Sequence, residues 1–189
     1  MAGVNRYKES RTTSYKSLSR SVCCVFISHR KSDVEVAKAV GRFLTDVVNV
    51  DIYLDENDRP LLAAVASGDD QKIVEYIEKG IASSTHLLGI ISESTRGSWW
   101  VPYEIGAARQ NGLAIAHMLL ENVDEVPSYL RISKLIKDWR ELIGWTQNLK
   151  GRHVNLSESY TYKSRMPIPG LPITRTKEVT YKSFWVGSR

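Results

Sequence analysis

The sequence predicts an α/β domain in which helices cover both faces of a mostly parallel central sheet. Between about residues 21 and 121, short apolar segments alternate with segments whose apolar residues recur every three or four positions, a pattern typical of βαβ units. The 189 residues are 42% apolar and 25% charged, which is ordinary for a folded domain. No apolar run reaches the ~18 residues that a membrane-spanning helix needs, so no membrane partner is expected.

Four apolar segments are expected to form strands. Ser21–Ser28 is a continuous run of small and β-branched residues, as in a strand that is covered on both faces. Val50–Leu54, Thr85–Ser92 and Leu113–Leu120 have a similar apolar character. Because crossovers between parallel strands are right-handed, these units predict a flavodoxin-like three-layer sandwich.

Helices are expected between the strands. The first follows Ser32 or Asp33 as its N-cap, the second follows Asp69 or Asp70, and Pro102 lies in the first turn of a third. The apolar stripes of the first two are Val36, Val40, Leu44 and Val47, and Ile73, Ile77 and Ile81. Asp55–Asp69 is expected to be a loop, because it contains proline and glycine. A closing helix is expected at Leu135, Trp139 and Leu142.

The charge distribution separates the folded body from its flanks. Residues 1–20 carry a net +4 and residues 150–189 a net +6, whereas residues 21–149 carry −5. We therefore expect a basic N-terminal tail over 1–20, the domain over 21–149 and a basic C-terminal extension over 150–189. Docking of that extension is expected through Tyr181, Phe184 and Trp185. Nucleic acid is not an expected partner, because the basic residues are scattered along the flanks.

Cysteine content and motifs exclude several kinds of site. Cys23 and Cys24 are adjacent and cannot build a disulfide framework, so a reducing, cytoplasmic location is expected. The sequence has no glycine-rich dinucleotide motif, no P-loop and no serine-hydrolase elbow. The four histidines lack metal-ligand spacing, so no metal is expected.

Three polar segments are expected to meet where ligands bind in open α/β sheets, at the carboxyl edge of the strands. Ser28–Asp33 offers two cations beside a helix N-terminus, which suits a phosphate. The others are Asp55–Asp69 and Glu93–Glu104, and the latter contains two adjacent indoles before its final carboxylate.

The same segments carry a family resemblance. Residues 25–29 (VFISH) followed by Asp33, residues 50–54 (VDIYL) followed by Asp55, and residues 100–105 (WVPYEI) resemble a Toll/interleukin-receptor (TIR) domain over roughly 21–145. The last motif is similar to that of TIR domains that cleave NAD+.

The resemblance implies a role for each matching position. Glu104 matches the catalytic glutamate of NAD+-cleaving TIR domains, with NAD+ as the substrate and no further cofactor. Ser28, His29, Arg30 and Lys31 match positions that line the NAD+ site. Asp55 begins the segment that shapes the pocket in relatives, and Asp58, Arg59, Pro60 and Leu61 match its assembly loop, through which TIR domains self-associate.

A single carboxylate is enough for this chemistry. The nicotinamide of NAD+ is already a cation and leaves as a neutral molecule, so no general acid is needed, unlike in most glycosidases. Glu104 is expected in the first turn of its helix, where the dipole favours the charged form by about 0.3–1 kcal/mol. Trp99 or Trp100 is expected to stack on the pyridinium ring. One of the two is expected in the core, and Trp100 is in register with the motif.

The leading interpretation is an NAD+ glycohydrolase or ADP-ribosyl cyclase of bacterial anti-phage immunity, similar to the TIR subunits of Thoeris systems, whose product signals to a separate effector protein. Three alternatives remain: a non-enzymatic TIR adaptor, a pathogen effector of host TIR signalling, and an enzyme like nucleoside deoxyribosyltransferases. Several of the candidate residues also have a structural alternative. Glu104 would then only complement the helix dipole, and Arg30 and Lys31 would be an ordinary charged helix entry.

Overall fold

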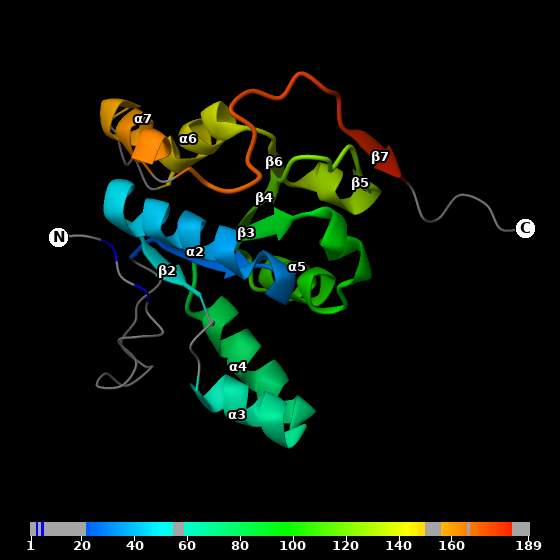
Figure 1. The fold of residues 1–189 in the computed structure, drawn as a ribbon. Helices are drawn as coiled ribbons and strands as arrows, with labels where there is room; N and C mark the ends of the chain where they lie inside the picture. Colours follow the sequence, from blue (N-terminus) through cyan, green and yellow to red (C-terminus); the bar gives the residue numbers. More distant parts are fainter. Residues whose placement is uncertain are drawn as a thin grey trace, which may run out of the picture.

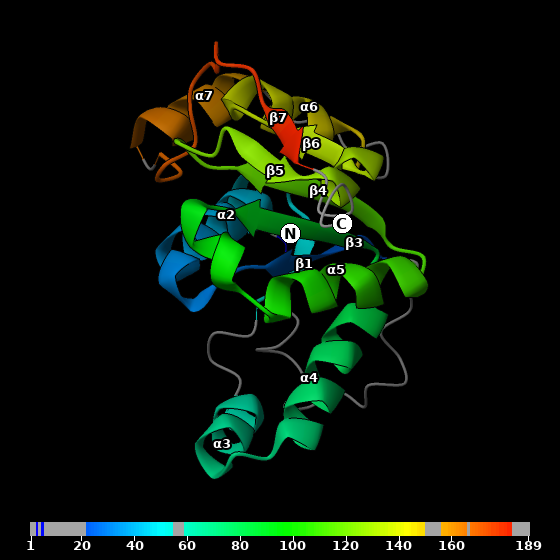
Figure 2. The same ribbon diagram turned by 90° about the vertical axis from the view of Figure 1, so that its right-hand side faces the viewer.

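The computed structural model describes residues 3 and 5 and residues 22–54, 59–149, 156–165 and 167–182. Its centre is a five-stranded sheet in the order β2-β1-β3-β4-β6, in which every adjacent pair is parallel. Its strands are β1 (Cys24–Ser28), β2 (Asp51–Tyr53), β3 (His86–Ile91), β4 (Ala114–Leu119) and β6 (Lys134–Ile136). Helices flank this sheet (Figures 1 and 2), which confirms the predicted flavodoxin-like three-layer fold.

The helices divide between two cores. Helices α2 (Val34–Arg42), α6 (Trp139–Gln147) and α7 (Leu156–Arg165) contribute to one core, and α4 (Asp70–Ala82) and α5 (Trp100–Gln110) to the other. The predicted stripe of isoleucines in α4 is buried, and the Asp69 carboxylate caps this helix by accepting from the backbone N–H of Lys72 at 3.2 Å. No helix in the described parts of the chain is long and apolar enough to cross a bilayer.

The expected loop over 55–69 is wrong in part, because residues 59–67 form helix α3 (Arg59–Ser67). Proline is tolerated in the first turn of a helix, where Pro60 lies, and Gly68 ends the helix with a positive φ of 67°. The signals taken for a loop therefore mark the two ends of a short helix. In Figures 1 and 2, α3 lies at the tip of a projection that it forms with α4.

Leu135 lies in strand β6 and not in the closing helix predicted for it. The helix itself is real but begins only at Trp139, after the capping carboxylate of Asp138. Three residues are too few to show the alternation or periodicity that distinguishes a strand from a helix. The strand forms because β4 has an open edge, with which residues 134–136 pair in parallel.

The C-terminal segment packs against the domain. Strand β7 (Thr180–Lys182) pairs in parallel with β5 (Glu125–Pro127), as Figures 1 and 2 show. Tyr181 packs at the edge of the core, with the guanidinium of Arg131 4.5 Å from the centre of its ring. The expected docking through Tyr181 is thus observed, whereas Phe184 and Trp185 lie outside the described residues.

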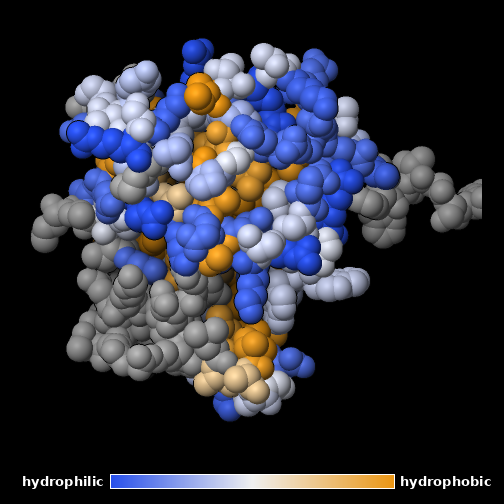
Figure 3. Space-filling model, in the orientation of Figure 1, coloured by the Kyte–Doolittle hydropathy of each residue, from blue (hydrophilic) through white to orange (hydrophobic). Residues whose placement is uncertain are grey.

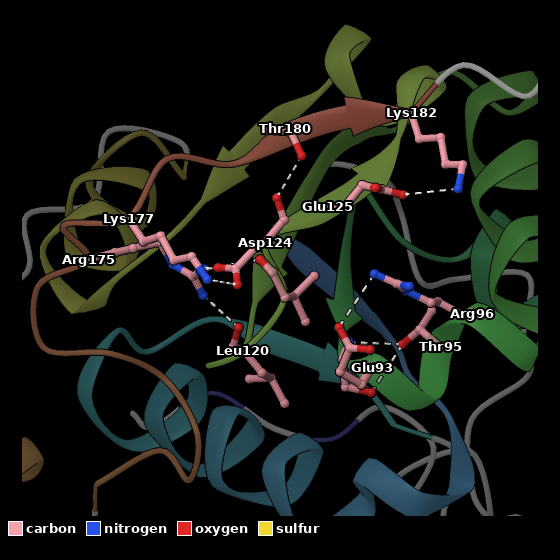
Figure 4. Close-up of polar contacts among 12 residues, drawn as sticks. Glu93, Thr95, Arg96, Leu120, Asp124, Glu125, Arg175, Lys177, Thr180 and Lys182 are labelled. Carbon is pink, nitrogen blue, oxygen red and sulfur yellow. Dashed lines mark hydrogen bonds and ion pairs between the residues drawn. The ribbon is translucent and has the colours of Figure 1, made fainter. Parts of the chain in front are cut away.

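Arg175 holds this segment in place. Its side chain is 6% exposed and lies 3.6 Å from the carboxylate of Asp124. Its guanidinium donates to three backbone carbonyls, those of Leu120 at 2.6 Å, Val123 at 3.0 Å and Lys137 at 3.2 Å. Figure 4 shows the side chain between the segment and the loop that follows β4.

We expect Arg175→Met to lower the free energy of unfolding by about 2–4 kcal/mol, because it removes the guanidinium donor from the part-buried carbonyls of Val123 and Lys137 and one of the donors to the carbonyl of Leu120. Lys177→Met is the control. Lys177 also pairs with Asp124 but is 72% exposed, and surface ion pairs contribute only about 0–1 kcal/mol. Urea unfolding measures both, and equal losses would contradict the role assigned to Arg175.

His117 is a buried histidine in the middle of β4. It is fully inaccessible to solvent, and neither ring nitrogen has a hydrogen-bond partner among the described residues. Gly89 on β3 leaves room for it, because a Cβ there would lie 2.9 Å from His117 Nδ1. Burial lowers the pKa of His117 to about 4.

This lowered pKa makes stability depend on pH. The unfolded chain takes up a proton on His117 below about pH 6.5, whereas the folded chain does so only near pH 4. Stability is therefore lost as the pH falls through this window, by about 3 kcal/mol in total. We expect His117→Leu to flatten the pH dependence of unfolding between pH 6.5 and 4. His29→Gln is the control, and an unchanged slope in His117→Leu would contradict the assignment.

Candidate functional site

A hydrogen bond between β1 and α5 forms the centre of the site. Ser28, the last residue of β1, donates through Oγ to Oε2 of Glu104 at 2.5 Å. Both residues are buried, with Ser28 1% and Glu104 6% exposed. The bond joins residues 76 positions apart in the chain. The fold thus brings together the two motif residues that the sequence places in separate segments.

Glu104 lies in the second turn of α5, and not in the first turn as expected. The helix begins at Trp100, so Glu104 is its fifth residue and the first turn holds no acid. The hydroxyl of Ser98 caps the helix by accepting from the backbone N–H of Val101 at 3.2 Å. The dipole therefore contributes less at Glu104 than we predicted, since its effect falls off within the first turn.

The three residues that follow β1 and carry basic side chains have different environments. His29 is half-buried, and its Nδ1 lies 3.3 Å from the carbonyl oxygen of Ile27. Arg30 is half-buried and donates through Nη1 to the carbonyl of Ser94. Lys31 is exposed. Arg30 is therefore positioned by the protein, whereas Lys31 projects into solvent.

A network of hydroxyl groups around Asp33 links the segment that follows β1 to the segment that follows β3. The Asp33 carboxylate accepts from Ser92 Oγ at 2.6 Å and from Ser94 Oγ at 3.1 Å. Ser94 Oγ lies 2.9 Å from Ser32 Oγ. Asp33 occupies the expected N-cap position of α2, but its side chain makes no cap hydrogen bond to that helix. This network occupies the topological switch point, where β1 leads to β2 on one side and β3 follows on the other.

Sequence reasoning did not find Ser92 and Ser94 as partners of Asp33. The signal was the placement of hydroxyl residues directly after a buried strand, at the edge where the segment 28–33 was also expected. Their geometry depends on the pairing of β1 with β3, in which Ser28 is opposite Gly89. The sequence alone does not show which strands are neighbours in the sheet, so the contact between these side chains could not be predicted from it.

The aromatic residues at the start of α5 are accessible. Trp99 is 90% and Trp100 42% exposed, so the expectation that one of them packs in the core is wrong. Trp100 meets Tyr103 edge-on, with ring centres 5.9 Å apart. The Tyr103 hydroxyl donates to Glu78 at 2.8 Å, and burial together with this hydrogen bond raises the pKa of Tyr103. Trp100 is therefore in contact with Tyr103 and also accessible to solvent.

A hollow of about 240 Å³ adjoins the site without including Glu104. Its walls include Ser92, Thr95 and Arg96 from the turn after β3, and Val101 and Pro102 from the first turn of α5. No group of three or more metal-ligating side chains occurs in the described parts of the chain.

Comparison with known families identifies this arrangement. A family model described as the TIR domain matches residues 25–150, about two thirds of the chain. The chain belongs to the TIR domain family. Comparison with curated proteins found no match.

The matched range contains the candidate residues of this TIR domain, including Ser28 and Glu104. Asp55 and Asp58 lie outside the described residues. Arg59 and Pro60 begin helix α3, and Leu61 is buried at 9% exposure in the core beneath α4 and α5. Of the four residues that match the assembly loop, Leu61 therefore serves packing in this TIR domain.

Proposed function

We propose that this TIR domain cleaves the bond between nicotinamide and ribose in NAD+, as a glycohydrolase or an ADP-ribosyl cyclase. The observation that carries the proposal is the buried carboxylate of Glu104, held by Ser28 at the carboxyl end of β1. A buried polar group in a site is a candidate for chemistry when other recognition groups surround it. Here Arg30 and Trp100 supply a cation and an aromatic surface.

The reaction needs a stabilised cation and no redox step. The bond between ribose C1′ and the pyridinium nitrogen breaks, and its electron pair neutralises the departing nicotinamide. The ribose is left as an oxocarbenium-like cation, which the Glu104 carboxylate stabilises by its charge. Water, the adenine base of the same molecule or another nucleophile then forms the new bond to C1′. Where the nucleophile is water, it releases one proton.

The neighbouring residues support substrate binding in this proposal. Ser28 orients the carboxylate, so its angle towards the ribose is set before substrate arrives. Arg30 is held by the Ser94 carbonyl at a sheet edge suited to phosphate. The accessible indole of Trp100 offers its face to the pyridinium ring, a contact that contributes about 0.5–2 kcal/mol.

We also propose a role for the product of the reaction. Hydrolysis would deplete NAD+, whereas a cyclic or conjugated ADP-ribose would be a messenger for a separate effector protein, as in bacterial anti-phage immunity. Water exclusion at the moment of capture decides between these products. Mass spectrometry of the product distinguishes them.

The first test is nicotinamide release from NAD+ by purified protein. We expect Glu104→Gln to lower turnover by at least ~10²-fold, because it keeps the shape of the side chain but removes its charge. Ser28→Ala should lower kcat by a smaller factor. Glu75→Gln, which changes an exposed glutamate on α4, is the matched control. A Glu104→Gln variant with wild-type turnover would contradict the proposed role, and an inactive wild type would favour an adaptor.

The second test concerns self-association, which we propose occurs through the segment that leads into the projecting helix α3. Charge reversal by Arg59→Glu should lower the sedimentation coefficient at high protein concentration. It should also weaken the rise of specific activity with concentration. Arg109→Glu changes an exposed arginine near the end of α5 and is the control. Unchanged sedimentation of Arg59→Glu would count against this surface.

A further inference from the structure

Two adjoining hollows lie between α6, α7 and the segment that follows α7. Their volumes are about 290 Å³ and 500 Å³, and both are lined by Trp139, Tyr160, Lys163 and Ile173. The larger lies within the usual size range of small-molecule sites. They lie on the side of the sheet where α6 and α7 pack, opposite the core under α5 that contains the neighbours of Glu104. The hollows are therefore separate from the proposed NAD+ site.

The walls of these hollows are apolar and partly uncovered. Tyr160 is 67% and Ile173 65% exposed, although both are large apolar side chains. Figure 3 shows apolar surface over α6 and the segment that follows α7, surrounded by hydrophilic surface. Phe43 in the core packs against Trp139, and the centres of the two rings lie 5.1 Å apart. An apolar group placed here would meet a rigid aromatic wall.

The charged residues of the walls are both cations. Arg140 lines the larger hollow, Lys163 lines both, and no acidic residue lines either. Neither cation forms an ion pair with the rest of the described chain. The Lys163 ammonium lies 5.6 Å from the centre of the Tyr160 ring. This arrangement favours a ligand with negative charge at one end.

Ser159 gives an independent sign of a ligand. Its side chain is 1% exposed and lines the larger hollow, and its Oγ has no hydrogen-bond partner among the described residues. A buried hydroxyl without a partner destabilises a fold, and most buried polar groups avoid this state. The Oγ itself is closed off from solvent in the unliganded chain, so an acceptor on a bound ligand would satisfy it after a small shift of the wall of the hollow.

We propose that the larger of the two hollows, here called the α6–α7 site, binds a small amphipathic anion with an apolar or aromatic body and a single acidic group. The body packs against Trp139, Ile143 and Ile173. The acidic group lies between Arg140 and Lys163 and accepts a hydrogen bond from Ser159. Binding here is independent of NAD+ cleavage, so this proposal fails or stands separately from the proposed function.

The first test uses fluorescence of 8-anilino-1-naphthalenesulfonate, an aromatic sulfonate, and of its uncharged analogue N-phenyl-1-naphthylamine. We expect the sulfonate to bind saturably at one site and at least 10-fold more tightly than the neutral dye. Displacement by decanoate or by 2-naphthoate shows whether an aliphatic or an aromatic body fits better. Equal affinity for the two dyes, or binding that does not saturate, would overturn the proposal.

Charge variants locate the binding. Lys163→Gln and Arg140→Gln should each weaken sulfonate binding at least 5-fold. Lys79→Gln is the matched control, because the Lys79 ammonium lies 5.3 Å from the centre of the Tyr76 ring on α4, the same arrangement on a different helix. If all three variants bind the sulfonate equally well, the α6–α7 site is not the binding site.

Ser159→Ala distinguishes a ligand role from a structural one. Without ligand it should raise Tm by a few degrees, because it removes an unsatisfied buried hydroxyl. It should also weaken binding of the sulfonate several-fold, because it removes a hydrogen-bond donor. A fall in Tm would mean that the hydroxyl has a partner within the protein, and unchanged affinity would mean that it does not face the ligand. Either outcome would overturn the role of Ser159.

Discussion

Burial of a carboxylate imposes the central constraint on this protein. A carboxyl group removed from water destabilises the fold unless hydrogen bonds compensate it, and the cost is larger when the group is charged. Glu104 is 6% exposed and takes the hydroxyl of Ser28 as a partner. This bond ties α5 to the carboxyl end of β1. The accessible indole of Trp100, one turn before Glu104, is thereby placed at the same edge of the sheet.

A second constraint follows from parallel pairing. Because β1 and β3 are neighbours, the loops that follow them leave the sheet at the same edge. Asp33 joins these loops through Ser92 and Ser94, and Arg30 adds a contact to the carbonyl of Ser94. The turn that precedes α5 is therefore held from the β1 side. Polar residues that would otherwise suit helix caps serve here to position the loops around the site.

Much of the fold could be predicted because its signals are local. The buried stripe of isoleucines in α4 and its cap at Asp69 follow from helical spacing and from a side chain that suits an N-terminus. The sequence does not reveal helix α3, because proline and glycine occur both at the ends of helices and in loops, and Pro60 and Gly68 fit either place. Strand β6 was missed because its three residues form a strand only when the edge of β4 is available. The clamp made by Arg175 has no sequence signature, because its acceptors are backbone carbonyls.

The sequence by itself determined the α/β class, the order of the main elements and the choice of Glu104 and Ser28 as candidates, because periodicity and short motifs depend on neighbouring residues. Only the tertiary structure decided that these two side chains meet, that Asp33 bonds to serines of another loop, and that Ser159 is buried without a partner in the described chain. The physical reason is that hydrogen bonding and burial depend on which strands pair and which helices pack, and residues 76 positions apart become neighbours only through that arrangement.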